Sequence, residues 1–252
     1  MKGALVTGAG MRVGRALAMA LAADGFFLFV HYNRSAAAAR RTVADIVAAG
    51  GKAKAVRADL SSARQAEALM GKCRARGVQL ICLVNSASLF KLDRAPTATA
   101  ADFDLHMAIN LRAPLLLSQA LARQLPKGET GLIVNLLDQK LYNLNPDFLT
   151  YTLSKVGLQG LTTLLAQAFA PQLRVAGIAP GLTLRSGNQT DIGFKRQHRE
   201  NLLGVGVTTD DLVRALRFIV ATPSFTGDTL IVDSGEHLIG RARDIAFDNK
   251  KK

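Results

Sequence analysis

The sequence predicts an α/β domain built around a doubly wound, seven-stranded parallel sheet, on the strength of three observations. Short apolar runs alternate with helical stretches along the whole chain. A glycine-rich turn directly follows the first apolar run. Several runs, at residues 80–84, 132–136 and 175–179, are apolar throughout, as expected of strands that are covered on both faces.

The elements follow one another in regular alternation. We expect strands at residues 3–7, 26–31, 53–57, 80–84, 132–136, 175–179 and 228–232. Helical spacing predicts helices at residues 12–23, 36–49, 62–76, 101–124, 150–170 and 209–221. Residues 180–207 form the one long irregular connection, where a ligand-covering loop is expected. This order is that of a Rossmann-like fold.

Length and composition limit the classes of function. The 252 residues, 49% of them hydrophobic, predict one domain at residues 1–245 and a basic tail at 246–252. Cys73 and Cys82 have no metal-binding or disulfide spacing, so no metal site and a reducing cytoplasm are expected. No apolar stretch reaches the roughly 18–20 residues of a membrane span. The net charge of +13 is scattered and predicts neither a nucleic-acid nor a membrane partner, and its reason stays open.

The glycine-rich turn and the end of the second strand point to a dinucleotide. The turn TGAGMRVG at residues 7–14 joins a strand to a helix, so its backbone can approach a pyrophosphate near the positive end of the helix dipole. A tight turn without a ligand is the alternative. The second strand ends in His31-Tyr32-Asn33-Arg34-Ser35, which lacks a carboxylate. Arg34 and Ser35 suit a 2′-phosphate, which favours NADPH, unless Arg34 is merely a solvated loop residue.

Two further turns lie at the same predicted edge. The carboxylate of Asp59, which with Leu60 closes the third strand, suits an adenine amino group; a helix N-cap is the competing interpretation, and Ser61 or Ser62 could serve equally as the cap. Asn85-Ser86-Ala87 follows the fourth strand at the carboxyl edge, where open α/β sheets bind ligands.

The candidate chemistry rests on a phenol, an ammonium and a carboxylate. Tyr151 and Lys155 are four positions apart, which places them on one helix face, and the cation is expected to lower the pKa of the tyrosine. Such a pair is common by chance. Asp138 follows the fifth strand and could converge with Tyr151 on one substrate. Asn110 lies in mid-helix, where asparagine has poor propensity, and a polar link to Lys155 is one explanation.

Together these motifs resemble the short-chain dehydrogenase/reductase family over almost the whole chain. Gly8 and Gly14 match the family's glycine loop, and residues 85–88 match its NNAG-like turn. Asn110, the Tyr151–Lys155 pair and Pro180-Gly181 follow in the family's order. The resemblance implies a homotetramer and a cofactor site made of Gly8, Arg12, Val13, Gly14, His31, Asn33, Arg34, Ser35, Asp59, Leu60, Asn85, Ser86, Ala87, Tyr151, Lys155, Pro180 and Gly181.

At three positions the chain departs from the common family pattern, and the residues found there resemble those of the pteridine reductase branch, which includes dihydromonapterin reductases. Arg12 replaces the middle loop glycine, Ser88 ends the turn, and Asp138 stands where the family has a serine. This resemblance implies that Phe90 and the nicotinamide sandwich a pterin, which Arg12 and Ser88 also contact. From the residues alone, Phe90 could equally be buried core.

The expected function is hydride transfer from NADPH to a carbon–nitrogen double bond of dihydrobiopterin, dihydromonapterin or dihydrofolate. Tyr151 and Asp138 would donate the proton, Lys155 would hold the ribose, and Asn110 would support Lys155 through a water. The alternatives are an NADPH-dependent reductase of 3-oxoacyl thioesters or ketones and a catalytically silent NADPH-binding protein. The intact tyrosine–lysine pair argues against the silent protein.

Overall fold

The computed structural model describes residues 1–185 and 189–247, and it confirms the predicted seven-stranded parallel sheet. The strand order is β3-β2-β1-β4-β5-β6-β7, and every neighbouring pair is parallel. The predicted tail beyond residue 247 lies outside the described residues. The strands are β1 (Lys2–Val6), β2 (Phe27–Tyr32), β3 (Lys52–Arg57), β4 (Gln79–Asn85), β5 (Gly131–Leu136), β6 (Leu173–Pro180) and β7 (Thr229–Val232).

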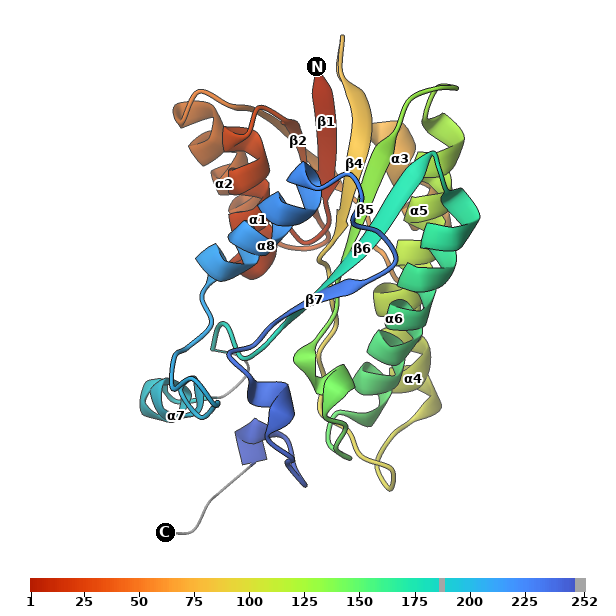
Figure 1. The fold of residues 1–252 in the computed structure, drawn as a ribbon. Helices are drawn as coiled ribbons and strands as arrows, with labels where there is room; N and C mark the ends of the chain where they lie inside the picture. Colours follow the sequence, from red (N-terminus) through yellow and green to blue (C-terminus); the bar gives the residue numbers. More distant parts are fainter. Residues whose placement is uncertain (186–188, 248–252) are drawn as a thin grey trace.

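Helices cover both faces of the sheet (Figure 1). One layer consists of α1 (Arg12–Ala23), α2 (Ala36–Ala48) and α8 (Thr209–Ala221). The other consists of α3 (Ala63–Lys72), α4 (Ala100–Met107), α5 (Ala113–Gln124) and α6 (Leu149–Phe169). None of the helices within the described ranges is long and apolar enough to cross a membrane.

The two helical layers explain why the central strands are apolar throughout. Successive strand residues point to opposite faces, so Ala4 and Val6 enter the core beneath α1, α2 and α8, while Leu5 enters the core beneath α3, α5 and α6. Burial on both faces therefore leaves no polar position in the middle of β1.

The predicted helix at residues 101–124 is interrupted. A five-residue π-helical stretch, η1 (Ala108–Arg112), separates α4 from α5. Such stretches are rare and occur frequently at functional sites. Asn110 lies within it and is buried, which accounts for a residue type that ordinary helix propensity disfavours at this place.

The connection at residues 180–207 is not irregular throughout, which corrects the prediction. It contains α7 (Asp191–Gln197), whose N-cap Thr190 accepts a hydrogen bond from the Gly193 N–H. Residues 186–188 of this connection lie outside the described residues. Three 3-10 turns, η2 (Gln139–Tyr142), η3 (Glu236–Leu238) and η4 (Ile245–Phe247), complete the structure. Figure 1 shows η3 and η4, in blue, with α7 and the start of α6 beyond the carboxyl ends of the strands.

Candidate active site

The glycine turn packs closely against the end of β4. Gly8 has a φ of +66°, and a Cβ there would lie 3.0 Å from the Ala87 Cα. A Cβ at Gly14 would lie 2.5 Å from the Gly8 carbonyl oxygen, so neither position tolerates a side chain. The N–H groups of Ser86 and Ala87 both donate to Thr7 Oγ1 over 2.9 Å. The first and fourth strand ends are thereby joined, and the α1 N-terminus beside them has no side-chain cap.

His31 supports this turn from beneath. The ring is buried, its Nδ1 accepts from the Gly8 N–H over 3.1 Å, and its Nε2 lies 3.1 Å from the Ala58 carbonyl oxygen. Burial lowers the pKa of His31 to about 4, which matches a neutral ring with one donor and one acceptor nitrogen. Both nitrogens are therefore engaged by the protein, and His31 positions the glycine turn instead of offering its own side chain to a cofactor.

The residues expected around the adenosine half of the cofactor differ in solvent exposure and in how far other protein groups already bind them. Arg34 and Ser35 are exposed at the start of α2, and Asn33 is half-buried. Asp59 Oδ1 accepts from the Ser61 N–H and hydroxyl over 3.0 and 2.7 Å, and these hydrogen bonds lower the pKa of Asp59. The N-cap of α3 is Ser62, so the capping alternative for Asp59 is wrong.

Two residues of the predicted cofactor set face the interior. Leu60 is buried in the core, so only its backbone remains for a ligand. Asn85 is buried as well, and its Nδ2 donates to Asn135 Oδ1 over 2.8 Å between β4 and β5. Both side chains therefore stabilise the interior and are not free to contact a cofactor. Val13, next to Arg12 at the glycine turn, is half-buried.

Asp138, Tyr151 and Lys155 converge at the carboxyl edge of the sheet. Tyr151 Oη donates to Asp138 Oδ2 over 2.6 Å, and Lys155 Nζ donates to the Leu136 carbonyl over 2.6 Å. Lys155 Nζ also lies 5.7 Å from the centroid of the Tyr151 ring. The end of β5 supplies the carboxylate and one turn of α6 supplies the other two groups, so the three are held by rigid elements.

The pKa of Tyr151 shifts in the direction opposite to the one expected. Burial and the carboxylate of Asp138 raise the pKa of Tyr151 well above its usual value. Burial also raises the pKa of Asp138, although Tyr151 and the Lys140 N–H donate to it. Burial lowers the pKa of Lys155 to about 8. The phenol therefore remains protonated at neutral pH and can act as a proton donor.

Asn110 contacts other groups than the expected lysine. Its Oδ1 accepts from the Leu89 N–H over 2.8 Å, and its Nδ2 donates to the Leu89 carbonyl over 3.0 Å and to Ser154 Oγ over 2.9 Å. The π-helical stretch thus fixes the segment before Phe90 and the residue before Lys155. Its direct effect is on backbone placement.

Phe90 lies at the surface of the site, so the buried-core alternative is wrong. Its side chain is 43% exposed, stacks on Phe148 at a centroid distance of 4.2 Å, and meets Tyr151 edge-on at 4.7 Å. Ser88, also exposed, donates to the Leu89 carbonyl over 3.3 Å. A flat ring placed on Phe90 would lie beside the phenol that can protonate it.

Arg12 connects the glycine turn to the 180–207 connection. It has a φ of +56°, in the left-handed region. Its guanidinium donates to the Arg185 carbonyl over 2.6 Å and to the Leu184 carbonyl over 3.4 Å. Arg12 therefore lies between the predicted cofactor and substrate regions.

Glu236 and Phe148 are site residues that the sequence interpretation missed. Glu236 is buried, its Oε2 accepts from the Leu182 N–H over 3.3 Å, and a Cβ at Gly181 would lie 3.1 Å from that oxygen. Burial raises the pKa of Glu236 to about 7. A glutamate soon after the last strand, at the carboxyl edge, was the available signal for Glu236. Phe148 had none, because its role depends on the ring of Phe90.

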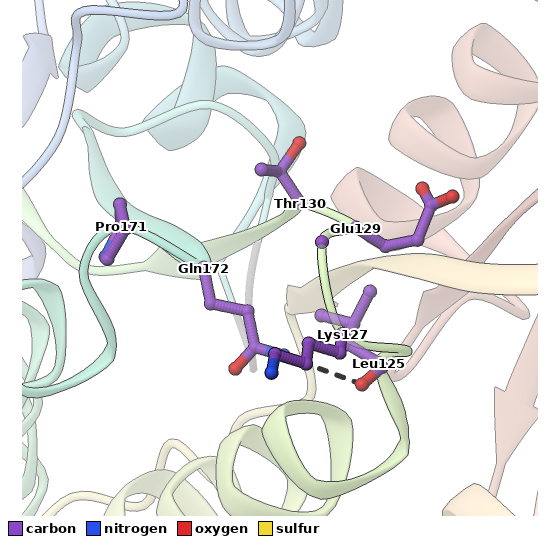
Figure 2. A pocket seen from close by; sticks show the side chains of 7 residues that line it. Leu125, Lys127, Glu129, Thr130, Pro171 and Gln172 are labelled. Atoms are coloured by element: carbon purple, nitrogen blue, oxygen red, sulfur yellow. Dashed lines mark hydrogen bonds between the residues drawn. The ribbon is translucent and has the colours of Figure 1, made fainter.

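A hollow at the opposite edge of the sheet takes no part in this site. Figure 2 shows it between the amino ends of β5 and β6, where Gln172 Nε2 donates to the Leu125 carbonyl over 3.4 Å. None of the predicted functional residues lines it. Ligands of open α/β sheets bind at the carboxyl ends of the strands, so this hollow is the wrong edge for the chemistry.

The fold and the tyrosine–lysine helix place the chain in a known class. The family model for short chain dehydrogenases matches residues 2–196, and the chain belongs to this family. The expected family is thus confirmed.

Three individual proteins are similar to this chain over almost its whole length. The crystal structure of FolM alternative dihydrofolate reductase 1 from Brucella suis in complex with NADP is 37% identical, with a TM-score of 0.91 over 96% of this chain and 97% of that one. An uncharacterized oxidoreductase of Methylorubrum extorquens is 35% identical over 93% of this chain and 97% of its own length. A 3-oxoacyl-[acyl-carrier-protein] reductase of Synechocystis is 29% identical over 92% of this chain and 95% of its own.

Proposed function

We propose that this protein is an NADPH-dependent reductase that converts a dihydropteridine, such as dihydrobiopterin, dihydromonapterin or dihydrofolate, to its tetrahydro form. The observation that carries the proposal is the Tyr151–Asp138 hydrogen bond of 2.6 Å beside the exposed ring of Phe90. A proton donor, a carboxylate and a stacking surface together suit a flat, nitrogen-rich ring. The similarity to a FolM dihydrofolate reductase supports the same substrate class.

The residues present fit NADPH. Gly8 and Gly14 leave a turn without side chains beside the uncapped N-terminus of α1, which suits a pyrophosphate. The exposed Arg34 and Ser35 suit a 2′-phosphate, and the carboxylate of Asp59 is at the third strand's end for the adenine. Lys155 would hold the nicotinamide ribose. When bound, NADPH supplies the hydride.

The chain's own residues supply the proton and orient the ring. Tyr151 stays protonated and can donate to the ring nitrogen of the carbon–nitrogen double bond, so that hydride on carbon and proton on nitrogen together give the reduced bond. Asp138 accepts from Tyr151 and can accept from ring N–H or amino groups, which a serine hydroxyl does less well. Phe90 would provide the stacking surface, and Arg12 and Ser88 would contact polar groups of the ring.

Carbonyl reduction is the second candidate, favoured by the similarity to a 3-oxoacyl-[acyl-carrier-protein] reductase. NADPH oxidation against dihydrobiopterin, dihydromonapterin, dihydrofolate, an acetoacetyl thioester and a simple ketone separates the two. We expect at least one dihydropterin to give the highest kcat/KM. Faster reduction of the thioester or ketone would replace the pteridine proposal, and NADPH binding without any turnover would support the silent protein.

The location and assembly state are also proposals. We propose a cytoplasmic homotetramer, as the family resemblance implies. Light scattering on the purified protein would give the mass of the assembly, and a monomer in solution would contradict the proposed tetramer.

A further inference from the structure

A buried carboxylate ties the C-terminal segment to the start of the catalytic helix. Asp147 has no exposed side-chain surface. Its carboxylate accepts from Arg94 Nε over 2.9 Å, from Arg243 Nε and Nη2 over 2.7 and 2.8 Å, and from the Asp244 N–H over 3.0 Å. Burial alone would raise the pKa of Asp147, but these hydrogen bonds lower it well below its usual range. The carboxylate is therefore charged and fully engaged.

The next residue, Phe148, is held in an unfavourable backbone conformation. It is the N-cap of α6 and has a φ of +56°, in the left-handed region, which a bulky residue rarely adopts. Beyond it, the Thr150 N–H donates to Asp93 Oδ1 over 3.1 Å, and the Thr150 hydroxyl lies 2.8 Å from His106 Nδ1. Contacts on both sides thus hold Phe148 in place, three residues before Tyr151.

The same C-terminal segment adds a third ring behind the stacking surface. Phe247 stacks on Phe148 at a centroid distance of 5.9 Å and an interplanar angle of 28°. Phe148 in turn stacks on Phe90 at 4.2 Å and 18°. The guanidinium carbons of Arg94 and Arg243 lie 5.4 and 5.6 Å from the Phe247 centroid. Two arginines therefore hold both the carboxylate and the outer ring.

The segment also contacts the two neighbouring loops. Gln197 of α7 donates through Nε2 to the Ile245 carbonyl over 2.9 Å, and Gln197 is buried. Lys140, also buried, donates through Nζ to Asp244 Oδ2 over 3.0 Å. Residues 243–247 are thus bonded to the segment after β5 and to the helix of the 180–207 connection, as well as to Asp147 just before α6.

We propose that residues 243–247, through the Arg243–Asp147 contact and the Phe247–Phe148–Phe90 stack, position the ring of Phe90 for a flat substrate. Arg243, Phe247 and Phe148 are then positioning residues that determine specificity without touching the substrate. This inference rests on the proposed function, because it takes Phe90 as the surface on which the substrate ring stacks.

Two variants and two matched controls test the proposal. Phe247→Ala removes the outer ring, and Arg243→Ala removes the contact to Asp147. Phe218→Ala removes one ring of the Phe218–Phe225 pair, and Arg217→Ala breaks the two hydrogen bonds between α8 and Asp24 at the C-cap of α1. Thermal unfolding and NADPH affinity are measured for all four, so that damage to the fold is recognised separately.

We expect Phe247→Ala and Arg243→Ala to raise the KM for the best dihydropterin at least fivefold, with kcat within about threefold and NADPH affinity within about twofold of the parent. Phe90→Ala should give the largest KM, because it removes the stacking surface itself. Arg243→Lys keeps the charge and should restore part of the loss. The two controls should leave the KM unchanged.

Two outcomes would contradict the positioning role of residues 243–247. The positioning role is overturned if Phe247→Ala and Arg243→Ala change the KM no more than the controls do, or change the KM of an acyclic 3-oxo thioester by the same factor. If the parent protein reduces no pterin, the proposed function fails on its own. The positioning is then measured with a bicyclic aromatic ketone against the acyclic thioester, and only the bicyclic substrate should lose affinity.

Discussion

Replacing Asp138 by serine tests the chemistry of the site most directly. Tyr151 donates to the Asp138 carboxylate over 2.6 Å, and burial raises the pKa of both groups. A hydrogen bond to a charged group contributes about 1.5–3 kcal/mol, which corresponds to roughly 10–150-fold in rate if it is used fully in the transition state. We therefore expect Asp138→Ser to lower kcat/KM for dihydropterins by one to two orders of magnitude.

The same substitution should act differently on carbonyl substrates. A serine hydroxyl can donate to a carbonyl oxygen, so reduction of an acetoacetyl thioester or ketone should be retained or increased. NADPH oxidation is followed for both substrate classes with the parent, Asp138→Ser and Asp138→Asn. The asparagine variant keeps the shape and removes the charge, so it separates the role of the carboxylate from that of its volume.

Stability gives an internal control for this experiment. The folded-state pKa of Asp138 is raised, so any stability that this group contributes is present below its unfolded pKa and is lost as the pH rises through the folded value. Wherever Asp138 is ionised in the folded protein, its burial costs stability, so at a pH above the folded-state pKa Asp138→Asn should unfold at the same temperature as the parent or higher. If Asp138→Ser reduces dihydropterins as well as the parent does, the reasoning about this carboxylate is refuted.

Four further predictions concern the cofactor, the proton donor, the lysine and the buried carboxylate. Arg34→Ala should reduce the preference for NADPH over NADH by at least tenfold, about 1.4 kcal/mol, in titrations with both cofactors, and an unchanged preference would contradict the 2′-phosphate contact. Tyr151→Phe should lower kcat roughly a hundredfold or more while NADPH still binds; near-normal turnover would exclude the proton-donor role. The pKa of Lys155 is lowered to about 8, so the ammonium that would hold the nicotinamide ribose loses its charge above that pH, and kcat/KM should fall as the pH rises above 8. A pH profile that stays flat well above pH 8 would contradict this role of Lys155. Asp147→Asn should lower the thermal midpoint by at least about 3 °C at pH 7. Because the folded-state pKa of Asp147 is lowered, its stabilisation is present above the unfolded-state pKa and is lost as the pH falls through the folded-state pKa, so the difference between variant and parent should shrink in acid. A difference that does not depend on pH would point to packing alone.

The strands could be predicted from the sequence because each has a local signal. A strand that is buried on both faces is apolar along its whole length, and such a run can be recognised in the sequence without knowledge of the fold. The predicted strand at residues 132–136 accordingly lies within the observed β5. The missed helix α7 has only seven residues, too few for a clear helical period among glycine and polar residues. The π-helical turn at Asn110 depends on contacts with Leu89 and Ser154, which lie far away in the chain.

The sequence singled out Asp138, Tyr151 and Lys155, which the fold brings together, but it missed Glu236 and Phe148 and did not predict the electrostatics of the site. Spacing along α6 reveals that Lys155 is near Tyr151, and from that alone a lowered tyrosine pKa follows. It does not reveal that Asp138 would reach the phenol at 2.6 Å, nor that the ammonium would donate to the Leu136 carbonyl. A hydrogen-bonded carboxylate stabilises the protonated phenol, and desolvation acts in the same direction.

This reversal bears on the substrate. Hydride transfer makes a carbonyl oxygen or a ring nitrogen basic enough to take the proton of Tyr151, so the raised pKa of Tyr151 does not by itself choose between the two substrates. A ring nitrogen of a dihydropteridine becomes far more basic as hydride arrives at the adjacent carbon, and Asp138 can stabilise a neighbouring N–H at the same time. We therefore expect any preference for carbon–nitrogen over carbon–oxygen double bonds to come from the Asp138 carboxylate as an acceptor of ring N–H groups, and the comparison of Asp138→Ser with the parent on both substrate classes tests this expectation.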